Sequence, residues 1–361
     1  MTDPADSTDP GGATGTTSLT TEFERVELPL KTPFTISRGT QHTADNVVVR
    51  IEDGEHVGVG AAAPSRHYGE TAATVEAVLP DLLAAVEAVG DPLALDAVDA
   101  RLDRVVERNP AAKAAVRIAC CDLAAKRLDV PLYRLLGLDG SRTVTSSFTV
   151  GIDDPERMAE KTRDAVDAGY SVLKTKLGTD DDEARLAAVR EAAPDARLRV
   201  DANEAWTPRE AVRNCAWLAE YDVEFCEQPV PADHPEGLRY VYERSAVPIA
   251  ADESCVTLAD VPRIADACDI ANVKLMKCGG PRQAVELFHA ARAHGLETML
   301  GCMIETNAAI AASVHLAPLL DYADLDGSLL LDSDPYDGVP MPGGDIDLST
   351  VDRPGTGARR S

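Results

Sequence analysis

Lysine is scarce in this sequence of 361 residues, which has only 8 lysines among its 35 basic side chains. Acidic side chains number 61, so the formal net charge is −26. A chain this negative lacks the basic surface that binding to nucleic-acid phosphates requires, which excludes nucleic acid as a partner. We expect instead a strongly hydrated acidic surface, of the kind that suits a halophilic protein.

Long apolar runs and paired cysteines are also missing. No apolar run reaches the roughly 18 residues that a membrane span needs, so we expect no membrane partner. Residues 1–18 are rich in Thr, Gly, Asp and Pro, which predicts a disordered tail rather than a signal peptide. The 8 cysteines show no metal-binding spacing, which favours buried, reduced thiols in a cytoplasmic protein.

Three acids stand at regular intervals in the middle of the chain. Asp201, Glu227 and Asp252 are separated by 26 residues (227 − 201) and 25 residues (252 − 227), and each ends a short apolar run. Each is followed by a stretch long enough for one helix, which is the repeat of a parallel (β/α) barrel. Because the carboxyl ends of barrel strands meet at one mouth, the three carboxylates should converge there. Three oxygen ligands suit Mg²⁺, with Mn²⁺ as the alternative.

Half of the lysines lie on either side of these acids, at positions 174, 176, 274 and 277. Lys174 and Lys176 share one face of the preceding strand, and Lys274 ends a later strand. Lys176 and Lys274 would therefore face each other across the metal, where one can take a proton from a carbon and the other can return one. Arginine cannot serve as such a base. We expect the pKa of the lysine base to be lowered by Mg²⁺ and by a second ammonium, which for Lys176 would be Lys174.

Five motifs at these positions resemble the enolase superfamily. They read KTK from 174, DAN from 201, EQP from 227, ADES from 251 and NVKLMKCGG from 272. Within the superfamily they are similar to the muconate-lactonizing-enzyme subgroup, which includes the dipeptide epimerases, over residues 20 to 345. The resemblance implies an α/β fold, a (β/α) barrel of modified TIM type with an N-terminal α+β capping domain. It also implies Mg²⁺-assisted proton transfer by two bases at the carbon next to a carboxylate. We further expect a homo-oligomer.

Residues that contact substrate follow from the same resemblance. Lys174 would touch the substrate carboxylate, Arg38 a side-chain carboxylate, and Asp324 with Asp326 the free ammonium of a dipeptide. Asn203 should hydrogen-bond a metal ligand, whereas Glu253 should point away from the metal. Three further positions near substrate are Thr149, Cys302 and Ile304.

The chain divides into a tail, a cap and a barrel in this interpretation. Residues 19–130 form the cap, completed by residues 331–355, and residues 131–330 form the barrel. We expect loops over 32–43 and 64–70, and a C-terminal end that frays. The first, seventh and eighth barrel strands are expected over 144–152, 299–303 and 323–326.

The favoured function is epimerisation of an L-Ala-L-Glu-like dipeptide. Muconate cycloisomerase is one alternative on the same scaffold, and o-succinylbenzoate synthase or N-acylamino acid racemase is another. A binding or structural protein that merely keeps the fold is disfavoured, because no binding role needs lysines on both sides of a metal.

Overall fold

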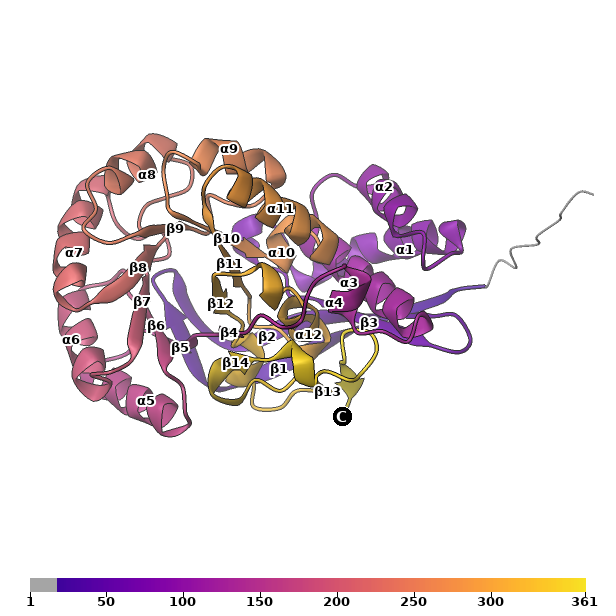
Figure 1. Cartoon of the computed structure of the whole chain (residues 1–361), viewed down its shortest axis with the longest axis horizontal. Helices are drawn as coiled ribbons and strands as arrows, with labels where there is room; N and C mark the ends of the chain where they lie inside the picture. The colour runs from indigo at the N-terminus through magenta and orange to yellow at the C-terminus, as the bar shows by residue number, and fades with distance from the viewer. Residues whose placement is uncertain (1–17) are drawn as a thin grey trace, which may run out of the picture.

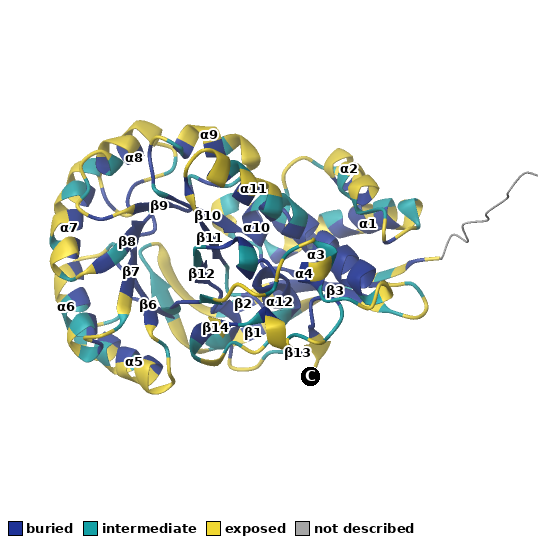
Figure 2. Cartoon of the chain, in the orientation of Figure 1, coloured by how far each residue is buried: buried dark blue, intermediate teal, exposed yellow. Residues whose placement is uncertain are grey.

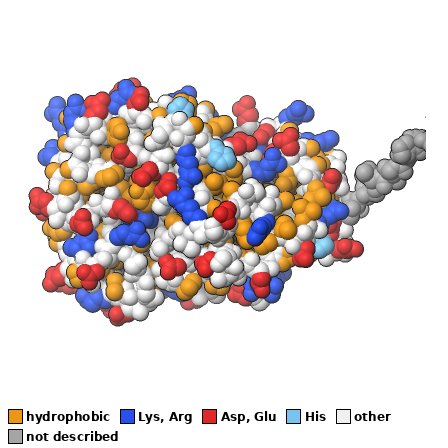
Figure 3. All heavy atoms as spheres, in the orientation of Figure 1, with side chains coloured by type: hydrophobic (Ala, Val, Ile, Leu, Met, Phe, Trp, Pro, Cys, Tyr) orange, Lys and Arg blue, Asp and Glu red, His pale blue; other side chains and the backbone are white. Residues whose placement is uncertain are grey.

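The computed structural model describes residues 18–361 and shows a barrel with a smaller α+β unit beside it (Figure 1). The expected disordered tail over residues 1–18 lies outside the described residues, apart from Ser18. Among residues 18–361, none of the helices combines the length and the apolar composition needed to cross a bilayer. Figure 3 shows acidic and basic side chains interspersed over one face of the molecule.

The α+β unit is built from an antiparallel sheet in the order β1-β2-β3 and from three helices. Helix α3 is rich in alanine and buried along most of its length, and it packs against β3. A Cβ atom at Gly60 would lie 2.2 Å from the Ala115 carbonyl oxygen, so glycine permits this close approach. The elements are β1 Thr20–Ile36, β2 Gly39–Glu52, β3 Val57–Ala62, α1 Ala72–Val89, α2 Leu95–Val105 and α3 Pro110–Arg127.

The loop expected over residues 32–43 is instead the end of a long β-hairpin. Strands β1 and β2 continue to a tight turn at Ser37 and Arg38, and Gly39 has φ 140°. The β-branched residues Thr35 and Thr40 face each other there, with their hydroxyl oxygens 2.9 Å apart. Cross-strand pairing therefore outweighed the polar composition of the segment. As a result, Arg38 is presented at the tip of a hairpin that reaches the barrel.

The barrel is an eight-stranded parallel sheet in the order β12-β11-β10-β9-β8-β7-β6-β5. A parallel bridge between Ser146 and Ala323 joins the two ends of the sheet. The strands are β5 Phe148–Val150, β6 Val172–Lys176, β7 Arg197–Asp201, β8 Val223–Glu227, β9 Ile249–Ala251, β10 Ile270–Lys274, β11 Glu297–Gly301 and β12 Tyr322–Asp324.

Helices surround these strands, with buried inner faces and exposed outer faces (Figure 2). Several begin with proline in the first turn, and α5 and α7 are capped by Asp154 and Thr207. They are α5 Pro155–Asp167, α6 Asp182–Ala192, α7 Pro208–Glu220, α8 Pro235–Tyr242, α9 Val261–Ile264, α10 Leu275–Cys278, α11 Pro281–Ala293 and α12 Asn307–Val314. The short helix α4 (Leu132–Leu135) precedes the barrel and packs against α3.

The expected first barrel strand over 144–152 is divided in two. Only β5 joins the barrel, whereas β4 (Val144–Thr145) pairs with β14 (Asp345–Ile346) from the C-terminal segment. The expected seventh and eighth strands also end earlier, at Gly301 and Asp324. Cys302, Ile304 and Asp326 consequently lie on the turns that follow these strands.

The C-terminal segment remains packed to its end, so the prediction that it frays is wrong. Strand β15 (Arg359–Arg360) pairs with β13 (Tyr336–Asp337). Just before β15, the backbone N–H of Thr356 donates to the buried carboxylate of Asp122 on α3, at 2.7 Å. These contacts are between residues far apart in sequence, which is why local composition did not reveal them.

Candidate active site

Three buried carboxylates meet at the carboxyl ends of neighbouring barrel strands. Asp201 and Glu227 end β7 and β8 in paired register, and Asp252 directly follows β9. One oxygen from each residue lies within 4.8 Å of the other two. The sequence spacing therefore brings these acids together as expected, and their hard oxygen donors fit a divalent cation such as Mg²⁺.

Polar neighbours orient each of these carboxylates. Asn203 donates its side-chain N–H to Asp201 at 3.2 Å, as predicted. Asn272 donates to Glu227 at 2.7 Å, and Gln228 accepts the backbone N–H of Asp252 at 3.0 Å. Asn272 lies two residues before Lys274 on β10, so the two side chains are on the same face of the strand. The sequence analysis nevertheless gave Asn272 no role.

Two lysines contact the acids from opposite sides of the barrel. Lys176 Nζ lies 2.5 Å from Asp201 Oδ2, and Lys274 Nζ lies 2.7 Å from Asp252 Oδ2. Their strands, β6 and β10, are four places apart in the ring of eight strands. A Cβ atom at Gly301 would lie 2.9 Å from Lys274 Cε, so glycine on β11 leaves room for this side chain.

Two further lysines are buried against the same acids. Lys174 contacts Asp324 and lies 3.3 Å from Glu227 Oε2. Lys277, to which sequence reasoning gave no site role, contacts the Asp252 side chain and donates to its backbone oxygen at 2.6 Å. The scarcity of lysine in the sequence, which drew attention to Lys174, Lys176 and Lys274, could have identified Lys277 as a site residue as well.

The charges in this cluster control one another's pKa values. Burial and the neighbouring Asp201 raise the pKa of Glu227 to about 7. Burial opposes ionisation of Asp252, but Lys274 and Lys277 outweigh it and hold the pKa of Asp252 well below its usual range. Burial would likewise lower the pKa of Lys274, but Asp252 and then Glu227 raise it. We expected the pKa of the lysine base to be lowered. For Lys274 the protein's side chains have the opposite effect and raise its pKa, because carboxylates face it directly.

A second acidic pair lies at the end of the cavity formed by β12. Ser147 Oγ donates to Asp324 at 2.6 Å, and the backbone N–H of Thr149 donates to Asp326 at 2.6 Å. Burial and the nearby Asp324 raise the pKa of Asp326 to about 6. Two carboxylates this close together repel each other unless a cation lies beside them. Lys174 supplies part of that positive charge, because its ammonium contacts Asp324.

A cavity of about 760 Å³ joins these groups beneath the tip of the β1–β2 hairpin and the loop over residues 64–70. All of the predicted catalytic and substrate-binding side chains line it, whereas the three acids of the triad are too deeply buried to do so. These lining residues are Arg38, Thr149, Lys174, Lys176, Lys274, Cys302, Ile304, Asp324 and Asp326.

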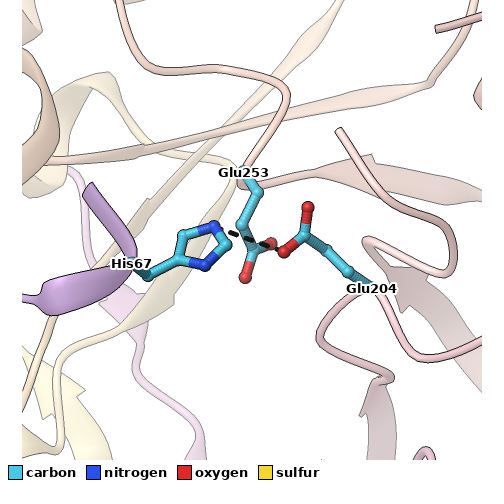
Figure 4. A group of neighbouring side chains, drawn as sticks. All are labelled: His67, Glu204 and Glu253. Atoms are coloured by element: carbon cyan, nitrogen blue, oxygen red, sulfur yellow. Dashed lines mark ion pairs between the residues drawn. The ribbon is translucent and has the colours of Figure 1, made fainter. Parts of the chain in front are cut away.

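Arg38 enters the cavity from the hairpin tip, but its guanidinium is already paired. Nη2 donates to Glu253 at 2.8 Å, and Nη1 donates to Glu204 at 3.1 Å. His67, on the second loop, lies 3.2 Å from the same Glu204 carboxylate (Figure 4). His67, Glu204 and Glu253 lie close enough together to hold a cation, yet the guanidinium of Arg38 occupies both glutamates. Glu253 contacts Arg38 in place of the triad, in line with the expectation that it points away from the metal.

Comparison with known proteins agrees with this architecture in both parts of the chain. The family model of the mandelate racemase/muconate lactonizing enzyme N-terminal domain matches residues 18–137. The model of the enolase C-terminal domain-like family matches residues 157–359. The chain belongs to the mandelate racemase/muconate lactonizing enzyme family. Its barrel and its α+β unit are therefore the catalytic and N-terminal domains of that family.

Relatives within the family act on dipeptides. An L-Ala-D/L-Glu epimerase of Bacteroides thetaiotaomicron is 36% identical over 94% of this chain and 87% of its own length. A hydrophobic dipeptide epimerase of Roseobacter litoralis is 40% identical over 93% of this chain and 97% of its own length. The structure of a dipeptide epimerase from Enterococcus faecalis V583, complexed with Mg and L-Leu-L-Tyr, has a TM-score of 0.88 at 36% identity. It covers 94% of this chain and 99% of that one.

Proposed function

We propose that this member of the family epimerises dipeptides at the carbon next to the carboxylate. The observation that carries the proposal is the placement of Lys176 and Lys274 on opposite sides of the buried triad. A carbon held between them has one ammonium or amine on each face. One lysine can remove the α-proton and the other can deliver a proton to the opposite face, which inverts the centre.

The triad of Asp201, Glu227 and Asp252 would hold Mg²⁺, with Mn²⁺ as the alternative ion. When bound, this ion stabilises the negative charge that develops on the substrate carboxylate after proton removal. Lys174 and Asn272 keep the glutamate of the triad oriented, and Asn203 does the same for Asp201. Burial excludes water from these carboxylates, which strengthens every electrostatic interaction around them.

The substrate's free ammonium would lie against Asp324 and Asp326 at the β12 end of the cavity. This pair favours a dipeptide over muconate, which has no ammonium, and over an N-acylamino acid, whose nitrogen carries no charge. Thr149, Cys302 and Ile304 lie on the walls nearby and would contact the body of the substrate.

We also propose that the protein works in a reducing, salt-rich compartment. All 8 cysteines are free, which suits the cytoplasm. The net charge of −26 suits high salt, because counterions screen the repulsion among acids. A homo-oligomer is proposed on the sequence resemblance alone.

The experiment that tests the function is a dipeptide library incubated with the protein and Mg²⁺ in D₂O. We expect deuterium at the α-carbon of the carboxyl-terminal residue, read by mass, together with formation of the epimer. Exchange into muconate lactone or into N-acylamino acids, with no exchange into dipeptides, would favour the alternatives.

A further inference from the structure

Lys277 is held by three acceptors at once. Its Nζ atom contacts Asp252 Oδ1, and it also donates to the backbone oxygens of Asp252 at 2.6 Å and of Asn272 at 2.9 Å. Three acceptors require three N–H donors, so the side chain is present as the ammonium and all of its donors are engaged. Only 1% of Lys277 is exposed, and it is not among the described residues that line the cavity. Lys277 therefore does not reach a substrate as an acid or a base.

Lys274 contacts the same carboxylate in a different way. Its Nζ atom donates to Asp252 Oδ2 at 2.7 Å, and this is its one hydrogen bond among residues 18–361. Unlike Lys277, Lys274 lines the cavity. One oxygen of Asp252 is therefore held by a lysine whose donors are all engaged, and the other is held by a lysine that borders the substrate's space.

The backbone that carries Lys277 is fixed from the α+β unit. Lys277 lies on the single turn of α10, which packs against α3. The buried guanidinium of Arg117 on α3 donates to the backbone oxygen of Gly279 at 3.1 Å. The Met276 sulfur accepts the backbone N–H of Ala63 at 3.3 Å. The place of Lys277 is thus set by packing between the two domains, before any metal or substrate is present.

We propose that Lys277 is a positioning residue, which fixes Asp252 through Oδ1 so that Oδ2 is the oxygen that ligates the metal. The inference rests on the metal site of the proposed function and deepens it, because it gives the two oxygens of Asp252 separate roles. A cation at Oδ2 takes the place of the Lys274 ammonium there, which leaves that lysine free for the substrate. Groups that orient metal ligands typically contribute about 10- to 100-fold to metal affinity.

The test compares two variants that each remove one positive charge from beside Asp252. Mg²⁺ affinity is measured by calorimetry, without substrate, for Lys277→Met and Lys274→Met. Loss of a positive charge favours Mg²⁺ binding in both variants, so the difference between them reports the positioning. We expect Mg²⁺ to bind at least about tenfold more weakly to Lys277→Met than to Lys274→Met. The matched control is Lys113→Met, which removes a buried lysine paired with Asp103 on α2 and should leave Mg²⁺ affinity unchanged.

Turnover separates the two lysines as well. Excess Mg²⁺ should restore α-deuterium exchange in Lys277→Met, because the metal site is weakened while both bases are intact. It should not restore the exchange that Lys274→Met loses. Mg²⁺ affinity of Lys277→Met equal to or above that of Lys274→Met overturns the inference. Exchange that excess Mg²⁺ fails to restore in a folded Lys277→Met variant overturns it too.

A crystal structure of the unaltered protein with Mg²⁺ decides the same question if a thermal melt shows that Lys277→Met is not folded. We expect the ion on Asp252 Oδ2, with Lys277 still on Oδ1 and Lys274 no longer in contact with Oδ2. An ion on Oδ1 with Lys277 displaced overturns the inference alone. Absence of Mg²⁺ binding by the unaltered protein overturns the metal site and this inference with it. Absence of α-deuterium from dipeptides overturns the epimerase function, and the calorimetric comparison still decides the role of Lys277.

Discussion

Lys174 contacts the Asp324 carboxylate and lies 3.3 Å from Glu227, so one ammonium links the acidic pair at the end of β12 to the triad. Asp324 is thereby neutralised within the protein. Asp326 accepts the backbone N–H of Thr149 at 2.6 Å and forms no ion pair among the described residues, so a substrate ammonium would supply its counterion. Recognition of the dipeptide's amino end should therefore depend on Asp326 more directly than on Asp324.

Blocking the substrate's ammonium tests this arrangement. Acetylation of the dipeptide should lower kcat/KM at least about 100-fold, a loss of roughly 2.7 kcal/mol, because a charged hydrogen bond in a desolvated site is lost. Asp326→Asn should shrink the difference between free and acetylated dipeptides. Equal turnover of the two substrates in the unaltered protein would contradict the assignment and point to N-acylated substrates.

The two lysines should each serve one face of the substrate. Lys176→Ala should lose α-proton exchange from one epimer, and Lys274→Ala should lose it from the other, each by about 10²- to 10⁴-fold. Both variants should abolish net epimerisation. Exchange is measured in D₂O with each pure epimer. The control is Lys161→Ala on helix α5, a half-buried lysine that pairs with Asp153 outside the cavity. Loss of exchange from the same epimer in both variants would contradict the two-face assignment.

Metal binding by the triad can be measured without turnover. We expect Mg²⁺ to raise the melting temperature, because an ion that binds the folded state stabilises it. Asp201→Asn, Glu227→Gln and Asp252→Asn should each abolish this dependence on Mg²⁺, whereas Asp180→Asn at an exposed acid should keep it. A chelator should stop turnover in the unaltered protein. Activity that persists in excess chelator would rule out the metal assignment.

Acid sensitivity should come in part from His315, which joins the barrel to the chain's C-terminal segment. Its Nδ1 accepts the backbone N–H of Tyr133 at 3.2 Å, and its Nε2 lies 3.1 Å from the Thr356 oxygen. Burial lowers the pKa of His315 from 6.5 to about 4. Because the folded state binds the proton less readily, its stabilisation is full above pH 6.5 and is lost as pH falls from about 6.5 to 4.

The consequence is measurable by denaturant unfolding at two pH values. Between pH 7 and pH 5 the His315 contribution to the free energy of unfolding should fall by about 2 kcal/mol. His315→Asn, which cannot be protonated, should remove this part of the pH dependence, whereas His294→Gln at an exposed position should not. An identical pH dependence in the His315 variant would show that other groups cause it.

Salt should stabilise the protein as a whole. The repulsion among its 61 acidic residues weakens when counterions screen them, so the melting temperature should rise from low to molar KCl. KCl is compared with sucrose at equal osmolality, which separates charge screening from general solute effects. A melting temperature that does not change with KCl would argue against adaptation to salt.

The sequence by itself determined where the triad and the two lysines lie. Asp201, Glu227 and Asp252 recur at the period of one strand and one helix, and all parallel strands end at the same mouth. Lys176 and Lys274 follow from the same periodicity. The positions of these five residues follow from local sequence patterns, which can be recognised without knowledge of contacts between distant residues.

Only the tertiary structure decided the partners of the remaining groups. Arg38 meets Glu253 across 215 residues and Lys174 meets Asp324 across 150, and such pairs leave no local signal. The hairpin that carries Arg38 formed because cross-strand pairing outweighed a loop-like composition. The raised pKa of Lys274 likewise depends on carboxylates from other strands. Electrostatic interactions are set by distance and burial in space, so the charge state of the cavity was decided only by folding.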